Sequence, residues 1–203
     1  MQKLSKETLD AIEQKVAAVE SQSACELVAV FAVRSDDYHY IPLLWAALTA
    51  LVVPAALIPW WHPGAGTFFT AQTITFALGA LLLRSDRLRV RLVPKSIRLH
   101  RAEQMAALQF TAQGLNAADA PPAVLFFISF EERYVRILAN AKVPVEDAQW
   151  QQVVDTMIAH IKDSRLEEGL GEAIGRIGEI LHKACPAAEN DVSNRFGNRM
   201  RLI

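Results

Sequence analysis

Two long apolar segments stand out in the pattern of hydrophobic and polar positions along the chain. Residues 41–60 contain no charged side chain, and their length matches the ~20 residues with which a helix crosses a bilayer. Residues 68–83 form a shorter run of 16, so this helix must recruit 65–67 or thin the bilayer to span it. The pattern predicts a transmembrane helical hairpin over residues 41–83, with a re-entrant second arm as the alternative.

The rest of the chain alternates between helical and strand-like periods. Apolar residues recur at helical spacing in four segments, 5–21, 97–112, 146–162 and 166–183. Three continuous apolar runs predict strands, 26–33, 123–130 and 133–140. The last two should form an antiparallel hairpin, and the second should lie parallel to the first, because a helix connects them. We therefore expect an α/β fold, a small sandwich of a three- to four-stranded mixed sheet with flanking helices, interrupted by the transmembrane hairpin.

These elements predict four parts of the chain. A discontinuous α/β domain comprises residues 1–40 and 95–185, and the hairpin of residues 41–83 interrupts it. A basic juxtamembrane segment covers residues 84–101. The polar, Asn-rich tail of residues 186–203 is expected to be disordered. A helical pair buried in a soluble core is disfavoured, since a domain of ~160 other residues has little interior in which to hide it.

Charge predicts the orientation of the hairpin in the membrane. The net charge is −1, yet seven basic residues follow the second apolar run, namely Arg84, Arg87, Arg89, Arg91, Lys95, Arg98 and Arg101. Basic residues next to membrane helices stay on the cytoplasmic side and attract anionic lipid head groups. We expect a two-pass protein of the bacterial inner membrane with both termini in the cytoplasm. Nucleic-acid binding is disfavoured, because no aromatic or glycine residues interleave with the basic ones.

Lipid contacts are predicted at both ends of the hairpin. Trp45 lies near one end of the first apolar run, and Trp60 and Trp61 lie near the other, where tryptophan favours the boundary between lipid and water. Arg84, Arg87, Arg89 and Arg91 are expected to contact lipid head groups.

Candidate chemistry is sparse. No P-loop, nucleophile elbow or zinc-protease motif is present, and no cofactor is expected. His160 and His182 are expected at the surface. The thiols of Cys25 and Cys185, 160 positions apart, match no metal or redox spacing and are expected to be buried or idle.

Asp36 and Asp37 are the most suggestive polar pair, because they follow a buried strand. They could hold Ca²⁺ or Mg²⁺ with help from Glu26 or Asn140, or they could form a solvated linker. Arg136, on the return strand with Arg133, could bind an anion or pair with Glu131 and Glu132, and pairing is the favoured interpretation.

Three segments carry a resemblance to a known family: ACELVAVFAV, PPAVLFFISFEERYVRILAN and LEEGLGEAIGRIGEIL. Together they resemble the TPM domain family, in a version with a membrane hairpin inserted after the first strand. The resemblance implies a small α/β sandwich, with Arg136 at the place of a family arginine. Members include thylakoid proteins linked to photosystem II repair and a receptor-associated protein, and phosphatase activity has been proposed for some. Residues 139–144 depart from the Gly-rich acidic segment of many members.

Two functional hypotheses follow from these observations. The favoured one is a membrane-anchored binding or scaffold module for membrane protein assembly or maintenance, whose partner is another membrane protein. The alternative is a weak phosphatase or divalent-metal-dependent hydrolase. Self-association of the hairpin through Ala77, Gly79 and Ala80 is a third, weaker possibility.

Overall fold

The computed structural model describes residues 6–38, 40–57, 64–83, 92–163, 165–187 and 201–202. The chain forms two compact units. One comprises residues 1–35 and 99–203, and the other comprises residues 36–98. We call the first the α/β unit.

A mixed sheet lies at the centre of the α/β unit, in the strand order β3-β2-β1-β4. Strands β1 (Glu26–Ala32) and β2 (Ala123–Ser129) pair in parallel, and β3 (Tyr134–Ala139) returns antiparallel to β2. Every residue of β1 and β2 is buried. Burial of both faces explains why their sequences are continuously apolar rather than alternating.

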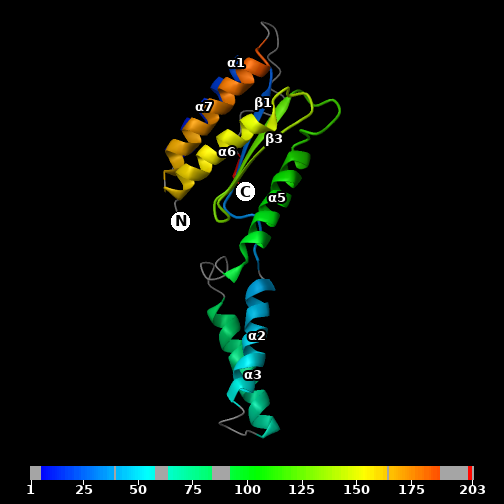
Figure 1. The fold of residues 1–203 in the computed structure, drawn as a ribbon, viewed down its shortest axis with the longest axis vertical. Helices are drawn as coiled ribbons and strands as arrows, with labels where there is room; N and C mark the ends of the chain where they lie inside the picture. The colour runs from blue at the N-terminus through cyan, green and yellow to red at the C-terminus, as the bar shows by residue number, and fades with distance from the viewer. Residues whose placement is uncertain are drawn as a thin grey trace. The chain divides into compact units, whose positions relative to one another are not determined.

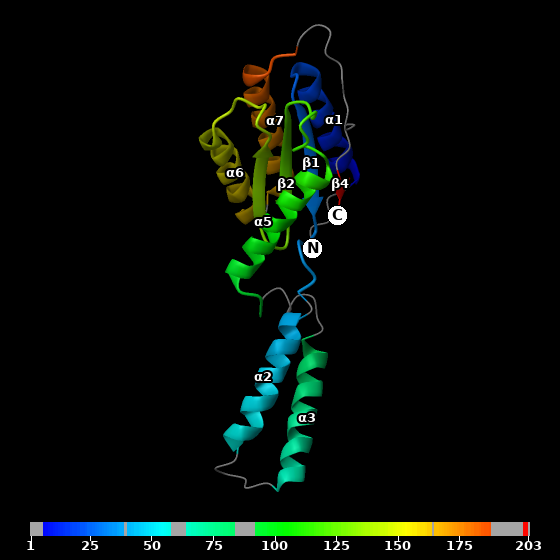
Figure 2. The same ribbon diagram turned by 90° about the vertical axis from the view of Figure 1, so that its right-hand side faces the viewer.

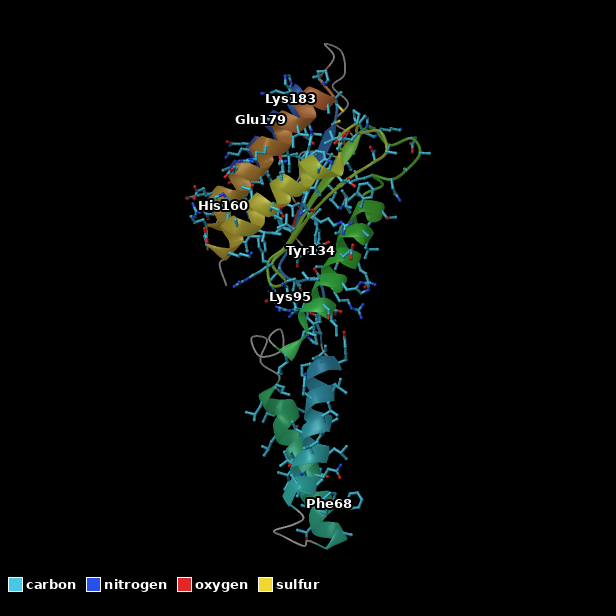
Figure 3. The ribbon with its side chains drawn as sticks, viewed as in Figure 1. Phe68, Lys95, Tyr134, His160, Glu179 and Lys183 are labelled. Atoms are coloured by element: carbon cyan, nitrogen blue, oxygen red, sulfur yellow. The ribbon has the colours of Figure 1, made fainter. Side chains whose placement is uncertain are left out.

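Helices cover both faces of the sheet (Figure 1). On one face lie α1 (Lys6–Gln22), α6 (Asp147–Lys162) and α7 (Leu166–Ala184), which share an apolar core with alternate residues of the strands. On the other face lies α5 (Lys95–Ala112), which packs on the remaining strand residues. Tyr134, labelled in Figure 3, joins this second cluster. The expected α/β class with a mixed sheet and the expected strand pairing are confirmed, whereas the membrane-spanning character of the predicted hairpin stays a prediction.

The buried face of α5 is made of small residues. Ala102 and Ala106 are its buried positions, whereas Leu108, one of the helically spaced residues, is 60% exposed. Alanine lets the helix backbone approach the sheet closely, and a periodic apolar pattern does not reveal this. The helix ends before Gly114, whose φ of 73° suits a residue without a side chain.

Two parts of the C-terminal segment pair with residues that precede the hairpin. Ser23 forms an isolated antiparallel bridge with Pro186, and the two-residue strand β4 (Arg201–Leu202) pairs in parallel with β1. The structure describes residues 186–187 and 201–202 of the tail that the sequence predicts to be disordered, and these residues pair with Gln22, Ser23 and β1. The rest of that tail lies outside the described residues, so its disorder stays a prediction.

The second unit contains two apolar helices, α2 (Tyr40–Leu57) and α3 (Ala65–Leu82), which lie side by side (Figure 2). Pro54 lies inside α2 without ending it. Helix α3 begins at Ala65 and so recruits the residues that precede its apolar run, which makes it about 27 Å long. We call residues 40–83 the α2–α3 hairpin.

Candidate functional sites: the apolar hairpin and the carboxyl edge of the sheet

Small residues form the contact between the two helices of the hairpin. On α2, Ala46, Ala50 and Pro54 are buried at intervals of four residues. On α3, a Cβ atom added to Gly79 would lie 3.3 Å from the Ala46 Cβ and 3.6 Å from the Thr49 Oγ1. Gly79 therefore lies against α2 of the same chain, which occupies the surface that the self-association hypothesis requires. Close approach through small side chains is typical of helices that pack in lipid.

Large apolar side chains form the outside of the hairpin. Among the described residues, fifteen large apolar side chains are exposed, and fourteen of them lie on α2 or α3. Leu51 is 58% exposed, Phe69 is 67% exposed and Leu82 is 69% exposed. Figure 3 shows side chains standing out along both helices, with Phe68 near the start of α3. In the hairpin, small residues are thus buried and large apolar residues are exposed. In a soluble core, the large apolar residues lie inside.

The threonines of the hairpin bond to their own helix. The hydroxyl groups of Thr70, Thr73 and Thr75 each donate to the carbonyl oxygen four residues earlier, at 2.8–2.9 Å. On α2, the Thr49 hydroxyl donates to the Trp45 carbonyl at 2.9 Å. These bonds satisfy polar groups without water, which a hydrocarbon environment requires.

By length and composition, one helix among the described residues could cross a membrane. It is Ala65–Leu82, with a mean hydropathy of 1.4 and none of its length buried. The apolar helix over Tyr40–Ala56 is shorter. The sequence pattern instead predicts that residues 41–60 are the better candidate for a membrane span. The difference arises because α3 includes residues 65–67, whereas residues 58–60 lie outside the described residues.

Most of the predicted lipid-contact residues cannot be placed. Trp45 is 42% exposed on α2. The other predicted contacts lie outside the described residues, and they are Trp60, Trp61, Arg84, Arg87, Arg89 and Arg91.

At the carboxyl edge of the sheet, two serines and a glutamate form a buried chain of hydrogen bonds. The Ser35 hydroxyl donates to the Ser129 Oγ at 2.8 Å, and the Ser129 hydroxyl donates to the Glu132 Oε2. The Ser35 backbone N–H donates to the Glu132 Oε1 at 3.2 Å. Ser129 is fully buried, and Ser35 and Glu132 are 7% and 5% exposed. We call these residues the Ser-Ser-Glu latch, because they join the end of β1 to the β2–β3 turn.

The sequence pattern missed this latch. Ser129 is the one polar residue in an apolar strand and Glu132 is one of two adjacent glutamates, so neither indicates its partner. Only the parallel pairing of β1 with β2, which places Ala32 opposite Ser129, brings the three residues together.

Asp36 and Asp37 follow the latch. The Asp36 Oδ1 accepts a hydrogen bond from the Tyr38 N–H at 3.2 Å, and Asp37 is exposed. Among the residues that the structure describes, no three His, Cys, Asp or Glu side chains are grouped to hold a metal ion. Cation binding by this pair stays a prediction.

The expected helpers of that pair lie at the wrong end of the strand. Glu26 begins β1 opposite Ala123, and the Asn140 N–H donates to the Ala123 carbonyl at 3.0 Å. Both residues therefore lie at the amino end of β1, about 20 Å from its carboxyl end. The expectation that Glu26 or Asn140 assists Asp36 is wrong, because four residues after Ala32 cannot bridge that length.

Asn140 and Lys142 instead tie down the loop that follows α5. The Asn140 Nδ2 donates to the Pro121 carbonyl at 2.7 Å, and the Lys142 Nζ donates to the carbonyls of Ala118 and Ala120. Residues 139–144, which lack the acidic character expected from the family resemblance, thus contain a lysine that binds backbone carbonyl oxygens.

Arg136 is paired, but with a partner other than the expected one. Its guanidinium lies 2.5 Å from the Glu103 Oε1 on α5 and 3.3 Å from the Tyr134 hydroxyl. The hydrogen bonds to Tyr134 and Glu103 raise the pKa of Arg136. Because alternate residues of β3 face α5, the helix supplies the carboxylate. Anion binding by Arg136 stays a prediction.

His160 is buried, and its expected surface position is wrong. It is 8% exposed, and its Nε2 lies 2.9 Å from the Glu172 Oε2, where α6 meets α7 (Figure 3). Gly169 allows this approach, because a Cβ there would lie 2.5 Å from the His160 Cβ. Arg176 completes the chain with a 2.9 Å contact to Glu172. In the sequence, the one indication that α7 approaches another element closely here is Gly169, which lies one turn before Glu172.

The geometry defines a class of protein, an α/β domain of one mixed sheet that is interrupted after its first strand by an apolar helical hairpin. A family model described as the TPM domain matches residues 72–180, which is more than half of the chain. The chain belongs to the TPM domain family. The matched range leaves out α1 and β1, which precede the hairpin, although β1 is a strand of the same sheet as β2 and β3.

A solved structure is similar in fold. The NMR structure of BA42 protein from the psychrophilic bacterium Bizionia argentinensis matches with a TM-score of 0.61 and 13% identity. The match covers 100% of this chain and 98% of that chain. At this identity the likeness concerns the fold alone. The comparison with curated proteins found no match.

Proposed function

We propose that this TPM domain protein is anchored in the bacterial inner membrane by a two-pass α2–α3 hairpin. The observation that carries the proposal is the apolar outside of the hairpin around a contact of small residues. Burying one large apolar side chain is worth about 1.5–3 kcal/mol, so leaving fourteen of them in water would be costly. Lipid removes that cost, and the internally bonded threonines fit the same environment.

The basic residues support the orientation. Seven lysines and arginines follow α3 over residues 84–101, and basic residues beside a membrane helix favour the cytoplasmic side. Both ends of the hairpin, and with them the α/β unit, then lie in the cytoplasm near anionic lipid.

For the α/β unit we infer a binding or scaffold role in membrane protein assembly or maintenance, with another membrane protein as its partner. This inference is motivated by the proposed membrane anchor and by the absence of a P-loop, nucleophile-elbow or zinc-protease motif from the sequence.

Matched lysine substitutions test the anchor. Leu51 on α2 and Leu108 on α5 are 58% and 60% exposed. We expect Leu51→Lys to weaken membrane insertion, because a lysine in the bilayer costs about 2.5–3.5 kcal/mol, and Leu108→Lys to have no effect. The measurement is the fraction of full-length protein that stays in membranes after alkaline carbonate extraction. Equal extraction of the wild type and both variants would contradict the proposal.

Co-purification tests the binding role. Tagged full-length protein from native membranes in mild detergent should retain the same membrane protein in repeated preparations, at a constant ratio. Protein that is recovered alone each time would argue against a scaffold.

The hydrolase alternative rests on the family resemblance and has its own test. Purified protein is assayed for phosphate release with Mg²⁺ or Ca²⁺, beside the double variant Asp36→Asn and Asp37→Asn. Release that requires the divalent ion and is lost in the variant would favour the hydrolase over the scaffold.

A further inference from the structure

The fold brings the two cysteines of the chain together. Cys25 immediately precedes β1, and Cys185 immediately follows α7, so 160 positions separate them in sequence. Cys185 packs against the apolar cluster that contains Cys25. The expectation of buried or idle thiols came from sequence spacing, which carries no information about how close the two cysteines lie in the fold.

Backbone contacts on both sides hold the two cysteines in place. The Ala24 N–H donates to the Cys185 carbonyl at 2.9 Å, and Ser23 and Pro186 form the antiparallel bridge. One turn back on α7, the His182 Nδ1 lies 2.9 Å from the Gln22 carbonyl oxygen. The backbone of Cys185 therefore lies beside that of Ala24, the residue before Cys25. A disulfide needs such neighbouring backbones, because it spans Cα separations of about 4.4–6.8 Å.

The two thiols differ in access. Cys25 is 1% exposed, whereas Cys185 is half-buried. Burial first, and then a hydrogen bond with the Cys185 thiol, raise the pKa of Cys25. Cys185 is therefore the thiol that an oxidant reaches, and Cys25 is a protected thiol in contact with it.

We propose that Cys25 and Cys185 form an oxidation site, which hydrogen peroxide converts to an intramolecular disulfide. The Cys185 thiolate attacks one peroxide oxygen, the O–O bond breaks, and the departing hydroxide takes up a proton to become water. Cys185 is then a sulfenic acid. The Cys25 sulfur attacks the Cys185 sulfur, the S–O bond breaks, and the hydroxyl leaves with the Cys25 proton as a second water. Two thiols are oxidised by two electrons, and one peroxide is reduced to two waters.

The disulfide would close a loop from Cys25 to Cys185, which contains β1, the α2–α3 hairpin, β2 and β3 and leaves out β4. Closing so long a loop restricts the unfolded chain strongly. Oxidised protein is expected to melt roughly 5 °C or more above reduced protein.

The test uses full-length protein in mild detergent, reduced and then treated with hydrogen peroxide. Alkylation followed by digestion without reductant should yield one linked pair of peptides that contain Cys25 and Cys185, with both free thiols lost together. A disulfide between two molecules could also use these two cysteines. It is recognised in the undigested, unreduced protein, because the covalent dimer has twice the mass of the monomer.

Single variants test the order of events. In Cys25→Ala, Cys185 should accumulate as a sulfenic acid that dimedone traps, at several times the wild-type yield. In Cys185→Ser, Cys25 should stay reduced. Two thiols that remain alkylatable in the wild type after peroxide, disulfides between molecules alone, or oxidation of Cys25 in Cys185→Ser at the wild-type rate would each overturn the proposal.

Discussion

At the scale of single residues, Glu132 holds two backbone segments together. Its carboxylate accepts from the Ser35 N–H and the Ser129 hydroxyl, and all three groups are buried. Leaving a buried donor without its acceptor lowers the free energy of unfolding by about 1–3 kcal/mol. The Glu132 carboxylate therefore stabilises the fold more than an exposed carboxylate without such bonds.

Glu132→Ala should lower the free energy of unfolding by about 2–4 kcal/mol, because it leaves two buried donors without an acceptor. The measurement is urea unfolding in mild detergent. The control is Glu13→Ala, which removes an exposed glutamate from α1 and should change stability by less than about 0.5 kcal/mol. Equal effects of the two substitutions would show that the latch does not stabilise the fold.

Glu172 makes stability depend on pH. The hydrogen bond from His160, followed by the contact with Arg176, lowers the pKa of Glu172 below its ordinary value of 4.5. A carboxyl whose pKa is lowered by folding stabilises the protein above its ordinary pKa, and this stabilisation is lost as the pH falls through the folded value.

Glu172→Gln should therefore melt below the wild type at neutral pH, and the difference should shrink as the pH falls below 4.5. Melting temperatures over an acid-to-neutral series measure this. Glu179→Gln on the same helix is the control, since its exposed side chain should give no such trend. A difference independent of pH would rule out the electrostatic explanation.

At the scale of elements, the hairpin depends on the close approach of α2 and α3. Gly79 packs against Ala46, whereas Gly66 on the same helix has no atom within 4 Å of an added Cβ. The two glycines thus offer one packed and one open position.

Gly79→Leu should separate the helices, since even its Cβ would lie 3.3 Å from the Ala46 Cβ. We expect the detergent-solubilised protein to melt several degrees lower, whereas Gly66→Leu should melt within about 1 °C of the wild type. Similar melting temperatures for both variants would exclude this contact as the basis of the hairpin.

At the scale of the whole molecule, the hairpin is an insertion in a single sheet. Strands β1 and β2 are hydrogen-bonded neighbours in parallel register, although the entire hairpin lies between them in sequence. Both ends of an inserted two-pass hairpin must return to the same side of the membrane, which is compatible with one continuous sheet.

Labelling in cells checks the predicted topology. In a protein without its native cysteines, Gly64→Cys at the turn between α2 and α3 should react with an impermeant maleimide in spheroplasts. Asp155→Cys on α6, also exposed, should react only after permeabilisation. Labelling of both sites, or of neither, before permeabilisation would contradict the two-pass arrangement.

Most of the fold could be predicted from the sequence, because local periods identify each helix and strand. The buried residues of α7, Leu170, Ile174 and Ile177 among them, are those that the helical spacing selects. The α5 face could not be predicted in this way, since Ala102 and Ala106 give a weak periodic signal and the exposed Leu108 gives a stronger one.

Apolar runs and periodicity by themselves determined the elements, the strand pairing and the presence of an apolar hairpin, because these follow from local backbone preference and hydrophobic burial. The tertiary structure decided the pairings across long separations, which are Ser35 with Ser129 and Glu132, His160 with Glu172, and Arg136 with Glu103. It also decided the packing of Cys185 against the cluster that contains Cys25. Such pairs depend on which elements become neighbours in space, and the type of a residue does not identify its partner in a distant part of the sequence.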